Sequence, residues 1–201
     1  MSCKELQKEN GETMRIEVSP DQVKAAFERV QNSDAYAQSR RLAQAGMLPV
    51  EMLQAMALRP EILDVLSAIG PAAYPGGMLE RSLKELVILE SSRTNECQFC
   101  TQSHRAMMRA LEMGEEPLQL LDEKSGRSER ELLALEYTRE AMRDSNAVSD
   151  ELFARLKAQF SDAEIVELTF LVGMIGMLNL FNNCLQVRYH DDYAQVKDAA
   201  Q

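Results

Sequence analysis

The sequence has no tryptophan and few aromatic residues of any kind. Aromatic side chains account for 5% of its 201 residues, although 45% are hydrophobic and twelve are methionine. Leu, Ala, Val and Met must therefore fill the interior, and this mixture favours helices because aromatic and β-branched residues are the ones enriched in strands. No stretch alternates apolar and polar residues in the manner of a half-buried strand. We expect an all-α protein.

Positive charge is also scarce. The chain has 32 acidic and 22 basic residues, which gives a formal net charge of −10. Such a charge repels nucleic-acid phosphates and anionic lipid, so we expect neither nucleic acid nor a membrane surface as a partner. The longest apolar stretch, LTFLVGMIGMLNLF, is only fourteen residues long. A stretch of this length is too short to span a bilayer and predicts a buried helix.

Cysteine is rare as well. The four cysteines are Cys3, Cys97, Cys100 and Cys184, and only one pair is close in sequence. A secreted disulfide framework would be denser. The N-terminal segment is charged and lacks an apolar run followed by a small-residue cleavage site, so we expect no secretory signal and a cytoplasmic location. In a cytosolic chain, a close cysteine pair is more often catalytic or metal-binding than structural.

Turn residues divide the sequence into three parts. Residues 1–18 lack a hydrophobic period and are expected to form a flexible N-terminal arm. We expect residues 19–77 to form an N-terminal helical layer that ends in the turn run GPAAYPGG, and residues 78–195 to form the core of the same compact domain. Four capping boxes mark helix starts: Ser19 with Gln22, Asn95 with Gln98, Ser128 with Glu131, and Ser161 with Glu164.

The segment NECQFCTQSH carries two cysteines three residues apart and a histidine four residues later. On a helix that starts at Asn95, the side chains of Cys97, Cys100 and His104 share one face, so Cys100 and His104 can come into hydrogen-bonding range. A helix N-terminus lowers a thiol pKa, and the thiolate is the species that attacks peroxides and disulfides. Cys97 gains more from the helix dipole whereas Cys100 is nearer to His104, so either thiol could be the one that attacks.

Two carboxylates on the preceding helix, expected over residues 78–93, are candidates to orient the imidazole of His104. If the two helices pack antiparallel, the rise of about 1.5 Å per residue brings Glu85 level with His104. Glu90 is the alternative, because it lies on the apolar stripe of that helix and is level with the cysteine pair.

A metal site is a weaker interpretation of the same residues. A structural zinc site needs four ligands, and the remaining candidates, Cys3, Cys184 and His190, are distant in sequence. We expect no metal and no organic cofactor, with Cys184 in the core and His190 in solvent. The plainest alternative is a polar helix start that carries two inert thiols.

Glu85, the CQFC motif at residues 97–100 and His104 together resemble the core of a known family, the carboxymuconolactone decarboxylase and alkylhydroperoxidase-D-like (AhpD-like) proteins. The resemblance covers most of residues 40–190. It implies an all-helical, AhpD-like bundle that assembles as homo-oligomers, either trimers or hexamers.

The resemblance also implies thiol peroxidase chemistry. In the family mechanism Cys100 attacks an organic hydroperoxide, Cys97 resolves the sulfenic acid to a disulfide, and His104 and Glu85 relay protons. A dithiol then reduces the disulfide, and a lipoyl or thioredoxin-like protein is the expected source. The best-known peroxidases of the family have a histidine where this chain has Phe99, so we expect a different rate or substrate.

Two other functions remain as alternatives. One is a lyase like the decarboxylase branch of the family, although that branch generally lacks the cysteine pair. The other is a helical oligomer whose disulfide senses redox state without turnover.

Overall fold

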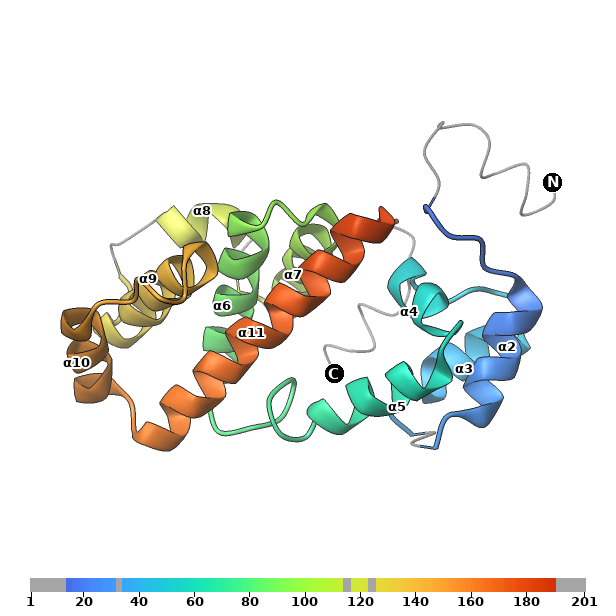
Figure 1. Ribbon diagram of the computed structural model, residues 1–201, viewed down its shortest axis with the longest axis horizontal. Coiled ribbons are helices and arrows are strands. Elements are labelled where there is room, and N and C mark those ends of the chain that lie inside the picture. The colour runs from blue at the N-terminus through green and yellow to red at the C-terminus, as the bar shows by residue number, and fades with distance from the viewer. Residues whose placement is uncertain (1–13, 32–33, 114–116, 123–125, 191–201) are drawn as a thin grey trace.

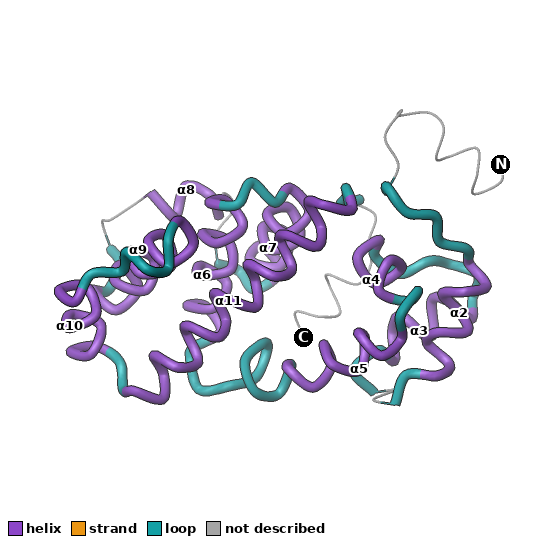
Figure 2. Tube along the Cα trace, viewed as in Figure 1, coloured by secondary structure: helices purple, strands orange, loops and turns teal. Residues whose placement is uncertain are grey.

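The computed structural model describes residues 14–31, 34–113, 117–122 and 126–190. Within these ranges the chain forms helices joined by loops and turns, and it forms no strand (Figure 2). The all-α prediction is therefore confirmed. Most of the predicted N-terminal arm lies outside the described residues. Its described part, residues 14–18, contains no helix, and Arg15 donates hydrogen bonds to the carbonyl oxygens of Cys184 and Leu185.

The described residues before the turn run form a small helical layer. Its helices are α2 (Pro20–Arg29), α3 (Ala37–Gln44), α4 (Glu51–Met56) and α5 (Pro60–Ile69). Their core contains Phe27 packed edge to face on Tyr36, with ring centroids 5.7 Å apart. Leu178 and Phe181 of the last helix also pack against this core. Figure 1 shows the layer at one end of the molecule, beside a larger bundle.

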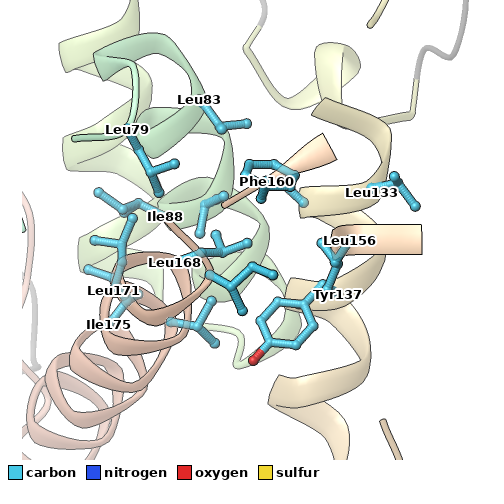
Figure 3. Packing of buried hydrophobic residues seen from close by; sticks show 14 of the residues in the cluster. Leu79, Leu83, Ile88, Leu133, Tyr137, Leu156, Phe160, Leu168, Leu171 and Ile175 are labelled. Atoms are coloured by element: carbon cyan, nitrogen blue, oxygen red, sulfur yellow. The ribbon is translucent and has the colours of Figure 1, made fainter. Parts of the chain in front are cut away.

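The larger bundle holds the main core. Its helices are α6 (Arg81–Thr94), α7 (Gln98–Ala110), α8 (Pro117–Asp122), α9 (Glu129–Arg143), α10 (Asp150–Gln159) and α11 (Asp162–Leu185). Helix α6 is central, because it packs against α7, α9 and α11 (Figure 1). Leu83 of α6, Tyr137 of α9 and Leu168 of α11 belong to the main core, as Figure 3 shows. The helix that carries Glu85 is thus covered on several sides.

Helix α6 buries charged side chains, and each of them has a partner of opposite charge. Lys84 forms an ion pair with Glu167 of α11 at 2.6 Å. Glu90 pairs with Arg93 at 2.7 Å and with Arg139 of α9 at 2.9 Å. A buried charge is costly unless it is paired. These contacts therefore fix α6 relative to its neighbours.

Helix α11 is longer than the apolar stretch from which it was predicted. It begins at the predicted capping box of Ser161 and runs for 24 residues. By length and composition alone this helix could cross a membrane, and 44% of its most apolar window is buried in the protein. The apolar stretch of fourteen residues is too short to span a bilayer, but the whole helix is not. One face of α11 packs in the core, and the other is exposed and apolar.

Candidate active site

The two cysteines lie at the start of α7, but the helix begins differently from the prediction. The N-cap residue is Cys97, and its sulfur accepts a hydrogen bond from the backbone N–H of Cys100 at 3.5 Å. The side chain of Asn95 instead donates to Oδ1 of Asn179 on α11, at 3.2 Å. The predicted capping box of Asn95 with Gln98 is therefore wrong, because a contact with α11 takes the asparagine side chain.

The two thiols are free, and their environments separate their pKa values. Hydrogen bonding with the Cys100 side chain and its backbone N–H, together with the amides of Asn179 and Asn182, outweighs burial and lowers the pKa of Cys97 to about 7. The interaction with Cys97 and burial raise the pKa of Cys100. Donors at a helix N-terminus favour a thiolate. A single negative charge on the pair therefore rests on Cys97.

Glu85 and His104 meet through the pairing of α6 with α7. Oε2 of Glu85 lies 2.7 Å from Nδ1 of His104. Burial opposes ionisation of Glu85, but the charge and hydrogen bond of His104, together with Tyr74 and Arg81, hold the pKa of Glu85 below its ordinary value. An ionised carboxylate can only accept hydrogen bonds, so Nδ1 carries the proton that is shared with it. Nε2 is left to bind or release a proton.

Two side chains that were not among the predicted site residues hold Glu85 in place. The hydroxyl of Tyr74 and Nε of Arg81 both donate to Oε1 of Glu85, each at 2.7 Å. The ring of Tyr74 also packs edge to face on His104, with centroids 5.6 Å apart. Arg81 stands four residues before Glu85, and this spacing was a usable signal. Tyr74 lies in the turn run GPAAYPGG, and local sequence patterns do not predict where this run packs. Its contact with Glu85 could therefore not be predicted.

The alternative carboxylate, Glu90, has other partners. Its two oxygens accept hydrogen bonds from Arg93 and Arg139. The imidazole of His104 is therefore oriented by Glu85 and not by Glu90.

The expected contact between Cys100 and His104 does not form. Among the described residues, no hydrogen bond joins His104 to either thiol. The sulfur of Cys100 instead accepts a hydrogen bond from Nδ2 of Asn182 on α11, at 3.2 Å. Asn182 was missed by the sequence analysis. The only sign of it in the sequence is that a polar residue stands within an apolar helix. Such a residue cannot be assigned a role until its tertiary contact is known.

Both thiols lie under a hydrophobic cover. Cys97 has no exposed surface and Cys100 is 6% exposed. Side chains from the start of α4, from the N-terminal segment, and from the end of α11 and the segment after it pack with them: Met14, Val50, Met52, Leu185, Val187 and Tyr189. The ring of Phe99 belongs to this cover and packs on Tyr189, with centroids 6.4 Å apart. Phe99 offers no group that transfers a proton.

Of the other candidate ligands, Cys3 lies outside the described residues, and Cys184 and His190 lie outside the site. Cys184 is exposed, so its expected place in the core is wrong. His190 is 44% exposed in its side chain, and its Nε2 lies 3.0 Å from Oε1 of Glu51. In the part of the chain that the structure describes, no three or more His, Cys, Asp or Glu side chains are grouped so as to hold a metal ion.

Comparison with known proteins places the chain in context. Residues 60–140 match the model of the Carboxymuconolactone decarboxylase family. An uncharacterized peroxidase-related protein from a Silicibacter species has 17% identity and a TM-score of 0.72, with 92% of this chain and 96% of that chain covered. A protein of unknown function from Agrobacterium tumefaciens, proposed to be the antioxidant defence protein AhpD, has 25% identity and a TM-score of 0.62, with 69% and 97% covered.

A debrominase has a similar fold, with 16% identity, a TM-score of 0.60, and coverage of 90% of this chain and 91% of that chain. No curated protein matches the sequence. The predicted AhpD-like fold is confirmed by these structures.

Proposed function

We propose that this chain, whose residues 60–140 match the model of the Carboxymuconolactone decarboxylase family, is a thiol peroxidase that reduces organic hydroperoxides with a dithiol as reductant. One observation carries the proposal. A pair of free cysteines, one with a pKa of about 7, stands at a helix N-terminus one turn before a histidine that is held by a buried carboxylate. Thiolate, proton carrier and orienting group are the parts that peroxide reduction needs.

In the proposed first step, the sulfur of Cys100 attacks the terminal oxygen of the hydroperoxide. The thiolate of Cys97 takes the proton from the Cys100 thiol, the O–O bond breaks, and Cys100 becomes a sulfenic acid. The leaving alkoxide takes a proton from His104 and departs as an alcohol. We assign the attack to Cys100 because it keeps some exposure, whereas Cys97 has none.

In the second step, the thiol of Cys97 displaces the hydroxyl group of the sulfenic acid, which gives the Cys97–Cys100 disulfide and one water. A dithiol then attacks Cys100, and Cys97 leaves as a thiolate. Its low pKa makes Cys97 the better leaving group. The second thiol of the reductant releases Cys100, and the reductant becomes a disulfide. A lipoyl or thioredoxin-like protein supplies such a dithiol.

The group around Glu85 serves the histidine in this scheme. Glu85 fixes the ring through Nδ1 and stabilises the imidazolium form, while Nε2 carries the proton for the alkoxide. Tyr74 and Arg81 occupy the other oxygen of Glu85 and prevent the carboxylate from turning away. Tyr74 and Arg81 are positioning residues, because they act through Glu85.

The test is steady-state consumption of cumene hydroperoxide with dihydrolipoamide as reductant. Wild type is expected to turn over, and Cys97→Ser and Cys100→Ser are each expected to fall to the uncatalysed rate. His104→Ala should lose about 10²- to 10⁴-fold, the usual contribution of a positioned acid or base. Cys184→Ser is the matched control, because this thiol is exposed and outside the site. Equal rates for wild type and Cys100→Ser would contradict the proposal.

The same variants separate the alternatives. A lactone-decarboxylating activity that survives loss of both cysteines would support a lyase. A disulfide that forms near the cytosolic glutathione potential without turnover would support a redox sensor. A shared fold does not fix a substrate, as the debrominase illustrates. Phe99 supplies no proton donor beside the thiols, so we expect turnover slower than in peroxidases with a histidine there.

We further propose that a second copy of this chain packs on the exposed apolar face of α11. Four of its apolar side chains are at least half exposed: Val166 at 69%, Phe170 at 50%, Met177 at 52% and Leu180 at 67%. With Gly173 between them they repeat at intervals of four and three residues, the spacing of a helix face that packs on another helix. An exposed apolar patch of this kind usually marks an interface. A trimer or hexamer would cover it.

A further inference from the structure

Asn182 is a polar side chain enclosed in the thiol site. It lies near the end of α11 and is 1% exposed. Its Nδ2 donates to the sulfur of Cys100 at 3.2 Å and lies 3.6 Å from the sulfur of Met52. Its Oδ1 is buried and has no hydrogen-bond partner among the described residues. A buried polar atom without a partner is rare in folded proteins and calls for a functional or structural reason.

Fixing α11 to the α6–α7 corner does not require this side chain. Asn179 donates to Oγ of Ser92 at 3.3 Å and accepts from Asn95 at 3.2 Å. Asn183 donates to the backbone oxygen of Asn95 at 3.0 Å. These two asparagines already join the helices, and each is hydrogen-bonded to the corner. The Asn182 amide is instead directed at the reacting sulfur.

We propose that Asn182 is a catalytic residue that stabilises the Cys100 sulfur as it becomes negatively charged and then holds the sulfenic acid formed there. This inference rests on the thiol peroxidase function proposed above. During attack, the proton of Cys100 passes to Cys97, and Nδ2 of Asn182 donates to the anionic sulfur. Hydrogen bonds to charged groups are stronger than those to neutral ones, so this contact strengthens as the charge develops.

The free oxygen of Asn182 has a role in the next step. The sulfenic acid on Cys100 carries an O–H donor that the thiol lacked, and Oδ1 is an acceptor beside the same sulfur. Accepting this hydrogen bond keeps the sulfenic hydroxyl in place until Cys97 displaces it as water. One amide thus pairs with the sulfur before oxygen transfer and with the hydroxyl after it. The amide side chain supplies both a hydrogen-bond donor and an acceptor, whereas an apolar residue at this position would supply neither.

The test compares Asn182→Leu and Asn182→Asp with Asn183→Ala, in a chain whose Cys3 and Cys184 are replaced by serine. The first variant keeps the volume and removes both polar groups, and the second keeps the shape and adds a negative charge. Asn183→Ala is the matched control, because it removes an amide one residue away that contacts no sulfur. Circular dichroism melts of all variants verify that each is folded.

The first readout is single-turnover oxidation by cumene hydroperoxide at pH 7. Both Asn182 variants should react about 10- to 100-fold more slowly than the parent chain, the loss expected for one hydrogen bond to a charged group. Trapping with dimedone in a Cys97→Ser background should show a shorter-lived sulfenic acid in Asn182→Leu. Asn183→Ala should match the parent. Oxidation rates within about twofold of the parent in both Asn182 variants would overturn the inference.

The second readout does not depend on peroxidase activity. In the Cys97→Ser background, the pH dependence of iodoacetamide alkylation reports when the Cys100 thiolate forms. Asn182→Leu should move its midpoint to higher pH, and Asn183→Ala should leave it unchanged. If the parent chain consumes no hydroperoxide, the proposed function fails, but a moved midpoint still supports the contact of Asn182 with the thiolate. An unmoved midpoint rejects this contact.

Discussion

The carboxylate of Glu85 has no exposed surface and is held by donors from three elements. His104 of α7 contacts one oxygen of the carboxylate. Tyr74, in the loop before α6, and Arg81 of α6 contact the other oxygen. The negative charge is compensated by the guanidinium of Arg81 and by the imidazole when it is protonated. A neutral amide of the same shape would lose the charge and could accept hydrogen bonds on one side only, because its nitrogen is a donor.

Glu85→Gln is therefore expected to preserve the fold and slow the peroxidase reaction about 10- to 100-fold, because an amide stabilises the imidazolium form less well than a carboxylate does. The measurement is the rate of hydroperoxide consumption as a function of pH. Rescue by Glu85→Asp is not expected, because the shorter side chain cannot reach Nδ1. A Glu85→Gln variant with the pH profile of wild type would show that the carboxylate does not act through His104.

The pKa of Cys97 predicts how the reaction rate depends on pH. Its pKa of about 7 means that the pair is mostly protonated at pH 6 and mostly a thiolate at pH 8. In the proposed scheme the Cys97 thiolate is the base that takes the proton from the attacking Cys100 thiol, so the rate of attack on hydroperoxide should rise between these values and level off above them. Thiolate absorbance at 240 nm, titrated in a chain lacking Cys3 and Cys184, measures the midpoint directly.

Replacement of Cys97 by serine should remove the absorbance step near pH 7 and leave only a step from Cys100. The interaction with Cys97 that raises the pKa of Cys100 is then gone, but burial still raises that pKa, so the remaining step should lie at higher pH. If the step near pH 7 remains in Cys97→Ser, the charge of the pair rests on Cys100 and not on Cys97.

At this scale, the sequence allowed the prediction of some contacts and not of others. The contact between Glu85 and His104 was predicted, because the two residues lie on consecutive helices joined by a short turn. In such a pair, helix geometry alone determines which residues lie level with each other. Asn182 is 82 residues from Cys100 in the chain. No local rule brings such residues together, so its contact with the thiol was found only in the structure.

At the scale of the elements, a buried ion pair joins α6 to α11 and to the loop before α6. Lys84 has no exposed surface and pairs with Glu167 at 2.6 Å. Glu167 also accepts hydrogen bonds from the backbone N–H groups of Met78 and Leu79, and Lys84 donates to the backbone oxygen of Gly76. The pair thereby holds the loop that carries Tyr74 near α6.

Glu167→Ala should lower the free energy of unfolding by about 3–5 kcal/mol, because it leaves the Lys84 ammonium buried without its partner. Urea denaturation followed by circular dichroism measures this loss. The double variant Lys84→Met with Glu167→Leu is the control, since apolar residues of similar size remove both charges and should recover most of the stability. A double variant as unstable as Glu167→Ala would show that the backbone contacts of Glu167, rather than the lost charge balance, dominate.

The helix starts show where local rules hold and where they fail. The capping boxes of Ser19, Ser128 and Ser161 were predicted, and each forms as expected. A capping box is made within four residues, so the sequence contains all that it needs. The box of Asn95 failed because α11 offers Asn179 as a partner for the same side chain. Competition between a local and a tertiary contact is not visible in the sequence.

At the scale of the whole molecule, the thiols are enclosed by segments from both ends of the described chain. Met14 and Met52 approach from the N-terminal side, and Val187 and Tyr189 from beyond α11. The sequence predicted a separate layer before residue 78, but it did not predict that this layer and the final segment would meet over the CxxC motif. Contacts of this kind depend on the position of every helix between them, so local patterns do not specify them.

The outer face of α11 gives the last prediction, which concerns assembly. If a second copy of the chain covers Val166, Phe170, Met177 and Leu180, purified wild type should be an oligomer by multi-angle light scattering. Phe170→Glu and Leu180→Glu should dissociate it, since each would bury an unpaired charge in the interface. Val65→Glu is the matched control, because that apolar side chain is 66% exposed and belongs to another helix, α5. A wild type that is monomeric, or that sediments with lipid vesicles, would contradict self-association. An oligomer that both α11 variants leave intact would place the interface on another surface.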